Sequence, residues 1–338
     1  MVEVWVRYGV TEIFTDIDGP IEILQPARRW SLTEGVVEKL AAELNSDSDT
    51  VLIDYVWGLE GFEQVVETCL RAVAGVHGDL SEVKVGVSCW RYNDPEVEKA
   101  LFNHMGKKLR EIGVGTVFHA KAAGEHSGAL FISPAVYWDG RVLGPGASAE
   151  VMGLSDVSLA VSPVVGCGGV VANLVYGGLE EVAGLSVREA LESSAFSPVK
   201  NPEIVLLGGP GYPADSKLAA CVNTLSSMAG VSPGKVVVTA LECSGGIGPP
   251  HFTELLTGLR NLEGTDTVSR SLAAWLETAS NHRVCLVTSL PAALVSRFLK
   301  ARHADTLDQA MMYAWRARSK DAAVLVVPNA LGTRLTGF

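Results

Sequence analysis

Short apolar runs rich in β-branched residues alternate along this 338-residue chain with stretches in which apolar residues recur at helical spacing. This pattern repeats strand, loop and helix, which favours largely parallel sheets with helices packed on their faces. We therefore predict an α/β protein with mostly parallel sheets flanked by helices. The predicted buried strands are residues 51–53, 83–88, 114–118, 129–132, 157–161, 204–207, 235–241, 284–288 and 323–327.

The segment 195–202 carries two prolines and separates two arrays of this kind. We predict an N-terminal α/β domain over residues 1–198 and a C-terminal α/β domain over residues 199–338, with a ligand cleft between them. The first domain should open with an alternating hairpin and a possible third strand at 21–24. Ser31 to Glu34 reads as a capping box that starts a helix.

Two glycine-rich loops, 208–213 and 242–248, each follow a predicted buried strand. Asp215 is a predicted N-cap for a helix that runs to about residue 230. In open parallel sheets, ligands bind outside the carboxyl ends of the strands, where both loops should lie. The glycines are equally explained by tight turns, because neither loop completes a known phosphate-binding pattern.

The run Gly-Gly-Pro-Gly-Tyr-Pro-Ala-Asp-Ser-Lys-Leu at 208–218 and the run Glu-Cys-Ser-Gly-Gly-Ile-Gly at 242–248 resemble the C-terminal half of the nickel-dependent lactate racemase family. The strand and helix pattern up to Asn329 fits the same family. The resemblance covers about residues 200–330. It implies the fold of that family, and for members with known activity it implies racemisation or epimerisation of 2-hydroxy acids.

Family members use a nickel-pincer nucleotide tethered to a lysine, a histidine ligand and two histidine bases. Where the family has Asp-x-Thr-Arg-Pro, this chain has Asp54 to Gly58 without the arginine. Where Gly-Thr-His-Arg is expected, Trp90 replaces the histidine and only Arg91 matches. No lysine lies between residues 121 and 200, and no histidine between 126 and 251. We therefore predict a degenerate racemase site, no bound metal and no cofactor.

The candidate site residues are charged, aromatic or glycine residues predicted at or just after strand ends, where they could converge on the cleft. Arg91 and Lys217 could hold a carboxylate or phosphate, and Trp57 and Trp90 could form an apolar wall. Each charged residue could instead be a helix cap or a surface ion-pair partner. Candidates for catalysis are Arg91, Lys217 and His251; candidates for ligand binding are Asp54, Trp57, Trp90, Arg91, Gly208, Gly209, Gly211, Tyr212, Asp215, Glu242, Gly245 and Gly246.

Composition limits the possible partners. The net charge is −11 and no basic run occurs, so we expect no nucleic-acid partner. The uncharged stretch 157–179 is long enough to span a membrane, but its glycines and Pro163 favour a buried strand and loop. The six cysteines lack metal-type spacing and mostly lie in apolar runs, which predicts reduced core residues. The first residues do not resemble a signal peptide, so we expect a cytoplasmic protein.

Three functions follow from these observations. The first is a lactate racemase-like protein that binds a small anionic metabolite or nucleotide in the cleft without nickel-pincer chemistry. The second is a diverged racemase or epimerase of a 2-hydroxy acid. The third is a non-catalytic scaffold subunit. The sequence leaves the ligand and the oligomeric state open.

Overall fold

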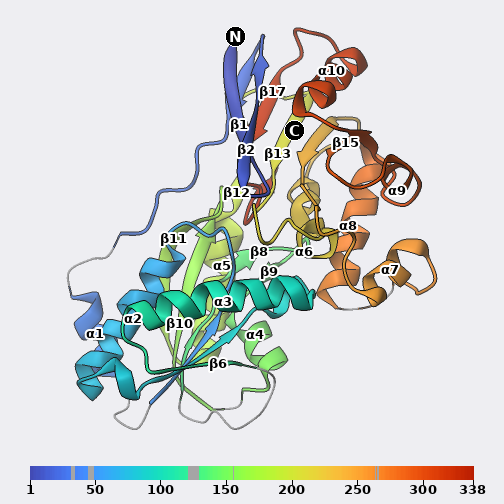
Figure 1. The fold of residues 1–338 in the computed structure, drawn as a ribbon. Coiled ribbons are helices and arrows are strands. Elements are labelled where there is room, and N and C mark those ends of the chain that lie inside the picture. The colour runs from blue at the N-terminus through green and yellow to red at the C-terminus, as the bar shows by residue number, and fades with distance from the viewer. Residues whose placement is uncertain (32–34, 45–48, 121–128, 155, 263, 265) are drawn as a thin grey trace.

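Two six-stranded sheets, each with packed elements on both faces, make up the computed structural model of this chain (Figure 1). The structure describes residues 1–31, 35–44, 49–120, 129–154, 156–262, 264 and 266–338. The predicted α/β class with mostly parallel sheets is confirmed. The expected capping box at Ser31 to Glu34 lies mostly outside the described residues.

The first sheet has the strand order β11-β10-β7-β4-β5-β6. All its neighbours are parallel except β10 and β11, which form an antiparallel pair. Its strands are β4 (Thr50–Asp54), β5 (Lys84–Ser88), β6 (Thr116–His119), β7 (Ala129–Ile132), β10 (Val157–Gly166) and β11 (Val170–Gly177). The uncharged stretch thus forms this antiparallel pair, and none of the described helices is long and apolar enough to cross a bilayer.

Helices pack on both faces of the first sheet. The larger apolar cluster lies under α1 (Val36–Glu43), α2 (Phe62–His77) and α3 (Pro95–Glu111), whose apolar residues recur on one side. On the opposite face, α4 (Pro145–Met152) packs near Leu52 and Phe131. Helix α5 (Leu179–Ser193) lies along β10. Short 3₁₀ turns, η1 (Leu80–Glu82) and η2 (Trp90–Tyr92), flank β5.

The second sheet has the order β16-β15-β14-β13-β17-β3, and all its strands are parallel. One face packs against α6 (Leu218–Cys221), the 3₁₀ helix η3 (Val222–Met228), α7 (Pro250–Thr257), α8 (Thr267–Asn281) and α9 (Ala292–Arg297). The other face packs against α10 (Leu307–Ala317) and the N-terminal hairpin. Its strands are β3 (Ile21–Ile23), β13 (Ile204–Gly208), β14 (Val236–Ala240), β15 (Arg283–Val287), β16 (Arg302–Ala304) and β17 (Val324–Val327).

The predicted hairpin is confirmed as β1 (Val2–Tyr8) and β2 (Thr11–Ile17), but it packs with the second sheet. Val4, Val6 and Ile17 contact the apolar face of that sheet, and β3 pairs with β17. The predicted division after residue 198 remains a prediction. The first 24 residues nevertheless pack with the C-terminal half, because their buried side chains complete its core.

Two details differ from the sequence-based expectation. The helix predicted from residue 215 to 230 is one short α-turn followed by a 3₁₀ segment, and Asp215 does not cap it. Strand β16 and the parallel pair β12 (Ala195–Phe196) and β18 (Arg334–Leu335) were not predicted. A tight turn at 138–141 joins the antiparallel pair β8 (Val136–Tyr137) and β9 (Val142–Leu143).

Candidate functional site

The strand order of the first sheet places its switch point, where the chain direction along the sheet reverses, between β4 and β7. Asp54 ends β4, and its Oδ2 accepts hydrogen bonds from Arg91 Nη2 at 2.6 Å and Nε at 3.1 Å. Both side chains are fully buried. Ser133, directly after β7, and Ser148 of α4 also donate to Asp54 Oδ2.

The Arg91 guanidinium has further partners within the chain. It donates to the carbonyl oxygens of Pro134 and Leu143 and to the hydroxyl of Ser148. A guanidinium with this set of acceptors has little capacity left for a ligand. The geometry therefore favours the structural interpretation of Asp54 and Arg91 over the anion-binding interpretation. Their network fills the first switch point.

The second sheet reverses between β13 and β17, and this switch point is also filled. Gly208 ends β13, and a Cβ atom there would overlap the carbonyl oxygen of Pro328, just after β17. Gly209 lies against Leu241, where a Cβ atom would come within 2.7 Å of a leucine methyl group. The two predicted ligand-binding glycines thus allow close packing of backbone in the position where a ligand commonly binds.

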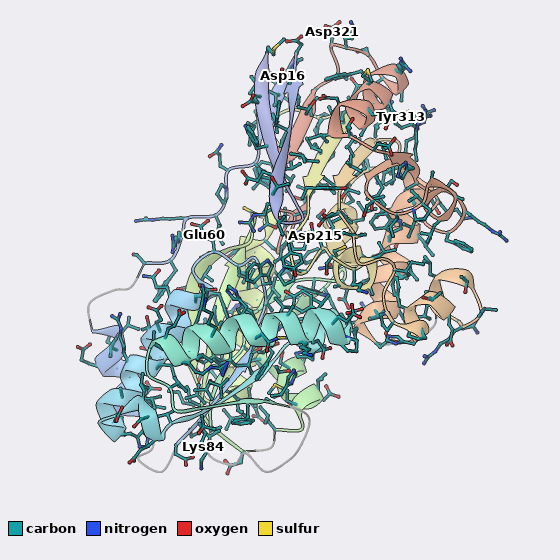
Figure 2. The ribbon with its side chains drawn as sticks, in the orientation of Figure 1. Asp16, Glu60, Lys84, Asp215, Tyr313 and Asp321 are labelled. Carbon is teal, nitrogen blue, oxygen red and sulfur yellow. The ribbon has the colours of Figure 1, made fainter. Side chains whose placement is uncertain are left out.

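Asp215 lies beneath the turn of the N-terminal hairpin (Figure 2), and Glu242 contacts the same turn. The Gly9 N–H donates to Asp215 Oδ2 at 2.8 Å, and the Glu242 carboxylate lies directly against the Gly9 α-carbon. Asp215 is completely buried, and its Oδ1 has no hydrogen-bond partner among the described residues. Burial, with a smaller contribution from the charge of Glu242, raises the pKa of Asp215. Burial and these carboxylates raise the pKa of Tyr8 to about 12. The pair anchors the hairpin.

We expect Asp215→Asn to change how stability depends on pH. Because the folded-state pKa of Asp215 is raised, its stabilising contribution is present below the unfolded pKa of about 4 and is lost as pH rises through the folded pKa. Asparagine can still accept the Gly9 hydrogen bond but carries no charge. The variant should match the parent near pH 4 and exceed it at pH 8, because only the parent then carries a buried charge. The difference should be about 1.4 kcal/mol for each unit by which folding raises the pKa of Asp215.

Urea midpoints of both proteins between pH 4 and pH 8 measure this difference. Asp49→Asn is the control of opposite sign, because a hydrogen bond from Lys84 lowers the pKa of Asp49. That variant should be less stable than the parent by a nearly constant amount over most of this range, because the contribution of Asp49 is present above its unfolded pKa of about 4 and is lost only as pH falls below it. Parallel pH profiles for Asp215→Asn and the parent would contradict the assigned ionisation of Asp215.

The remaining candidates of the second half lie apart from one another. Lys217 Nζ forms an ion pair with Glu96 of α3 at 2.8 Å, which joins the two halves of the chain. Gly245 packs against the Lys217 side chain, and Gly246 takes a left-handed turn with φ 93°. His251 lies in the first turn of α7. Trp90 lines a separate hollow of about 840 Å³ beside α4.

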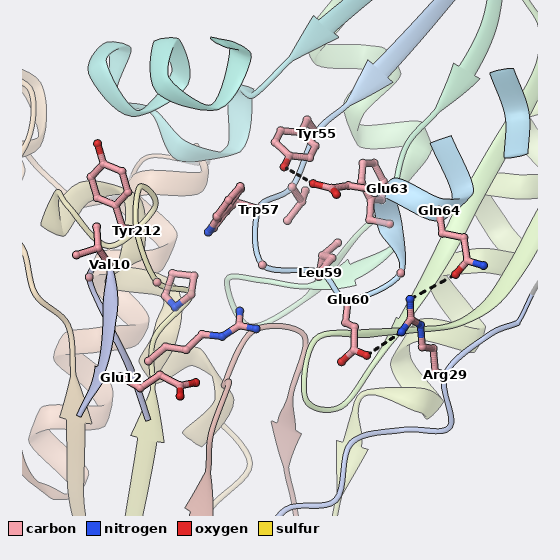
Figure 3. Close-up of a pocket in the computed structure, with 18 of the residues that line it drawn as sticks. Val10, Glu12, Arg29, Tyr55, Trp57, Leu59, Glu60, Glu63, Gln64 and Tyr212 are labelled. Atoms are coloured by element: carbon pink, nitrogen blue, oxygen red, sulfur yellow. Dashed lines mark hydrogen bonds and ion pairs between the residues drawn. The ribbon is translucent and has the colours of Figure 1, made fainter. Parts of the chain in front are cut away.

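A cleft of about 1290 Å³ lies between the N-terminal hairpin and the segment that follows β4 (Figure 3). Its walls are the hairpin residues 7–12, the segment 55–67 after β4, and residues 210–212 after β13. Of the predicted ligand-binding residues, it brings together Trp57, Gly211 and Tyr212. Trp57 is held in place because its backbone N–H donates to Tyr92 Oη at 2.7 Å and its ring packs edge-on against His104.

Arg7 is the cleft residue that sequence reasoning missed. Its side chain runs from the hairpin past Gly211 to Gly58, where Nη1 comes 3.5 Å from the position a Cβ atom would occupy. Among the described residues, no ion pair or hydrogen bond of the guanidinium is formed. Buried and exposed side chains alternate along residues 2–8, which places Arg7 on the strand face opposite to Val4 and Val6. This alternation was the sequence pattern that could have identified Arg7 as facing away from the core.

The other cleft charges are engaged, with the exception of Glu12. Arg29 pairs with Glu60 at 3.1 Å and donates to Gln64, as the dashed lines in Figure 3 show. Glu63 accepts from Tyr55 Oη and forms an ion pair with Lys108. Burial and the charge of Glu63 raise the pKa of Tyr55. Arg7 is therefore the cation of the cleft that is placed to meet an anionic group.

The expected absence of the nickel-pincer nucleotide remains a prediction. The β10–β11 turn carries Cys167, which contacts a backbone carbonyl and whose pKa is raised by burial. The gap between Tyr92, Trp138 and Asn223, at the junction of the halves, measures about 10 Å³. Among the described residues, no group of three or more His, Cys, Asp or Glu side chains could hold a metal ion.

Comparison with known proteins gives a sequence match to one family and several structural likenesses. Residues 198–334 match the family described as the lactate racemase C-terminal domain. No curated protein sequence matches the chain. The fold is similar to that of the lactate racemase apoprotein from Thermoanaerobacterium thermosaccharolyticum, with a TM-score of 0.62 and 15% identity over 99% of this chain and 100% of that one.

A protein from Thermotoga maritima has a similar fold, with a TM-score of 0.56 and 9% identity over 90% of this chain and 98% of its own. At these identities the structural likenesses establish the fold, and activity does not follow from fold. Residues 198–334 therefore match the lactate racemase C-terminal domain family in sequence, and the fold of the whole chain is similar to that of a lactate racemase.

Proposed function

We propose that this lactate racemase-like protein binds a small anionic metabolite, or a nucleotide, in the cleft between its halves, without nickel-pincer chemistry. The observation that carries the proposal is the Arg7 guanidinium, which crosses the cleft and has no acceptor among the described residues. A guanidinium presents paired N–H donors that match a carboxylate or phosphate. We keep a cytoplasmic location as part of the proposal.

The walls around Arg7 suit a small organic anion. Trp57, Leu59 and Tyr212 supply apolar and aromatic surface, while backbone at Pro210 and Gly211 lines the same hollow. Ligand sites commonly combine an apolar lining with a few polar groups that fix orientation. The hydrogen bond from the Gly9 N–H to Asp215 fixes the hairpin that carries Arg7, so the backbone from which the Arg7 side chain extends is held in position.

Arg7→Gln should weaken binding of a small anion about 10- to 100-fold, because a hydrogen bond to a charged group contributes about 1.5–3 kcal/mol. The probes are lactate, malate, phenyllactate and adenosine monophosphate, each titrated calorimetrically into the full chain. We expect at least one of them to bind the parent protein. Arg29→Gln is the matched control, because Arg29 lines the same cleft but is paired with Glu60.

Binding that survives Arg7→Gln unchanged would remove the cleft from the proposal. The absence of binding by all four probes would favour the scaffold function. Turnover of lactate or malate would favour the diverged racemase or epimerase, for which the fold is the supporting observation. Intact mass and nickel content of protein produced with the cofactor-forming enzymes test that alternative directly, since a nickel-containing adduct would restore pincer chemistry.

A further inference from the structure

We infer that the ligand of the cleft is a zwitterion that carries an ammonium group beside its carboxylate, as a free α-amino acid does. The inference rests on the proposed function and specifies the class of ligand. Its basis is the pair Arg7 and Glu12, two unlike charges that face the same cleft from neighbouring strands.

Arg7 and Glu12 are directly opposite each other in the β1–β2 register. Opposite residues in an antiparallel pair have Cα atoms about 4.5–5.5 Å apart and side chains on the same face, so an ion pair between them would be the ordinary outcome. Here no such pair forms. Among the described residues, the Glu12 carboxylate, like the Arg7 guanidinium, has no ion-pair or hydrogen-bond partner.

The course of the Arg7 side chain explains why the two charges stay apart. It extends across the cleft and passes Gly211 on its way to Gly58. A Cβ atom added to Gly211 would lie 3.6 Å from Arg7 Cδ, and one added to Gly58 would lie 3.5 Å from Arg7 Nη1. Glu12 extends from the neighbouring strand of the hairpin and lines the same cleft (Figure 3). The cleft therefore presents a cation and an anion that do not pair with each other. An amino acid, with its carboxylate and ammonium on one carbon, can satisfy both charges at once.

The charges around the cleft favour a zwitterion over a simple anion. Among its lining carboxylates, Glu60 is paired with Arg29, Glu63 with Lys108 and Glu67 with Arg71. The charges left are the Arg7 guanidinium and the Glu12 carboxylate, one of each sign. A simple anion would meet Arg7 and leave Glu12 unpaired, whereas the ammonium group of a zwitterion is attracted to Glu12.

The experiment compares four matched pairs in which an α-amino acid and its 2-hydroxy acid differ by ammonium against hydroxyl. The pairs are alanine and lactate, leucine and 2-hydroxyisocaproate, phenylalanine and phenyllactate, and aspartate and malate, titrated calorimetrically into the full chain. For the tightest pair we expect the amino acid to bind at least 10-fold more tightly than the hydroxy acid. Glu12→Gln should reduce this preference to about twofold or less, because a charged partner contributes at least about 1.5 kcal/mol.

Two controls make the result specific. Glu60→Gln removes a cleft carboxylate that is already paired with Arg29, and it should leave the preference above fivefold. Arg7→Gln should weaken the amino acid and the hydroxy acid together. Equal binding of both members, unchanged by Glu12→Gln, would overturn the zwitterion and leave the proposed anion site standing. Failure of every amino acid to bind while an anion still depends on Arg7 would overturn it as well.

Discussion

Replacement of Arg91 by alanine should destabilise the protein by about 3–5 kcal/mol, because it leaves the Asp54 carboxylate buried and without its cation. Neither side chain of this pair is exposed, and the guanidinium also binds the carbonyl oxygens of Pro134 and Leu143. These contacts join β4, η2, the segment after β7 and β9 at one point. The midpoint of urea denaturation measures the loss.

The paired variant Asp54→Asn with Arg91→Met separates the two causes of this loss. It removes both charges and keeps much of the side-chain volume, so it should recover most of the stability lost in Arg91→Ala. A loss below about 1 kcal/mol in Arg91→Ala, together with weaker anion binding, would contradict the structural role. It would return Arg91 to the set of ligand-binding residues.

The sequence predicted the buried strands well because their signal is local. The runs 204–207 and 235–241 contain consecutive apolar residues of the kind that fill parallel strands buried on both faces, and both appear as β13 and β14. Strands β12, β16 and β18 have two or three residues each, too short for a periodic pattern. The place of β3 depends on pairing with β17, about three hundred residues later, which no local pattern records.

The candidate site was harder to predict because each charged residue depends on a distant partner. Asp215 was expected to cap the following helix, but its carboxylate accepts from Gly9 at the other end of the chain. The sequence left Arg91 open between a ligand site and an ion pair, and the structure pairs it with Asp54. Arg7 looked like an ordinary polar residue of a hairpin, and its importance follows from the packing of that hairpin beside the cleft.

Both switch points of this protein are filled by its own chain, which explains the position of the cleft. In the first sheet the Asp54–Arg91 network lies between β4 and β7, and in the second the backbone at Gly208 meets that at Pro328. The open volume lies to one side, between the segment after β4 and the hairpin. A ligand would therefore meet the N-terminal hairpin, which contributes Arg7 and Glu12.

Gly208→Ala tests the filled switch point of the second sheet. The added Cβ would overlap the Pro328 carbonyl oxygen, lie 2.8 Å from its carbonyl carbon, and approach Val6 Cβ to 3.3 Å. The obstacle is backbone between paired strands, so relief requires β13 and β17 to separate or the hairpin to move. We expect a loss of about 3 kcal/mol, the upper part of the range for overpacking a core.

The matched control is Gly75→Ala in α2, where an added Cβ meets no atom within 4 Å. That change should stabilise the protein by about 0.5–1 kcal/mol, because alanine is the better helix former. Thermal denaturation of both variants measures the contrast. If Gly208→Ala were as stable as the parent, the backbone there could open readily, and the crevice between β13 and β17 would become accessible to a ligand. The close packing at Gly208 therefore decides whether the second sheet binds a ligand at its switch point or only supports the hairpin that lines the cleft.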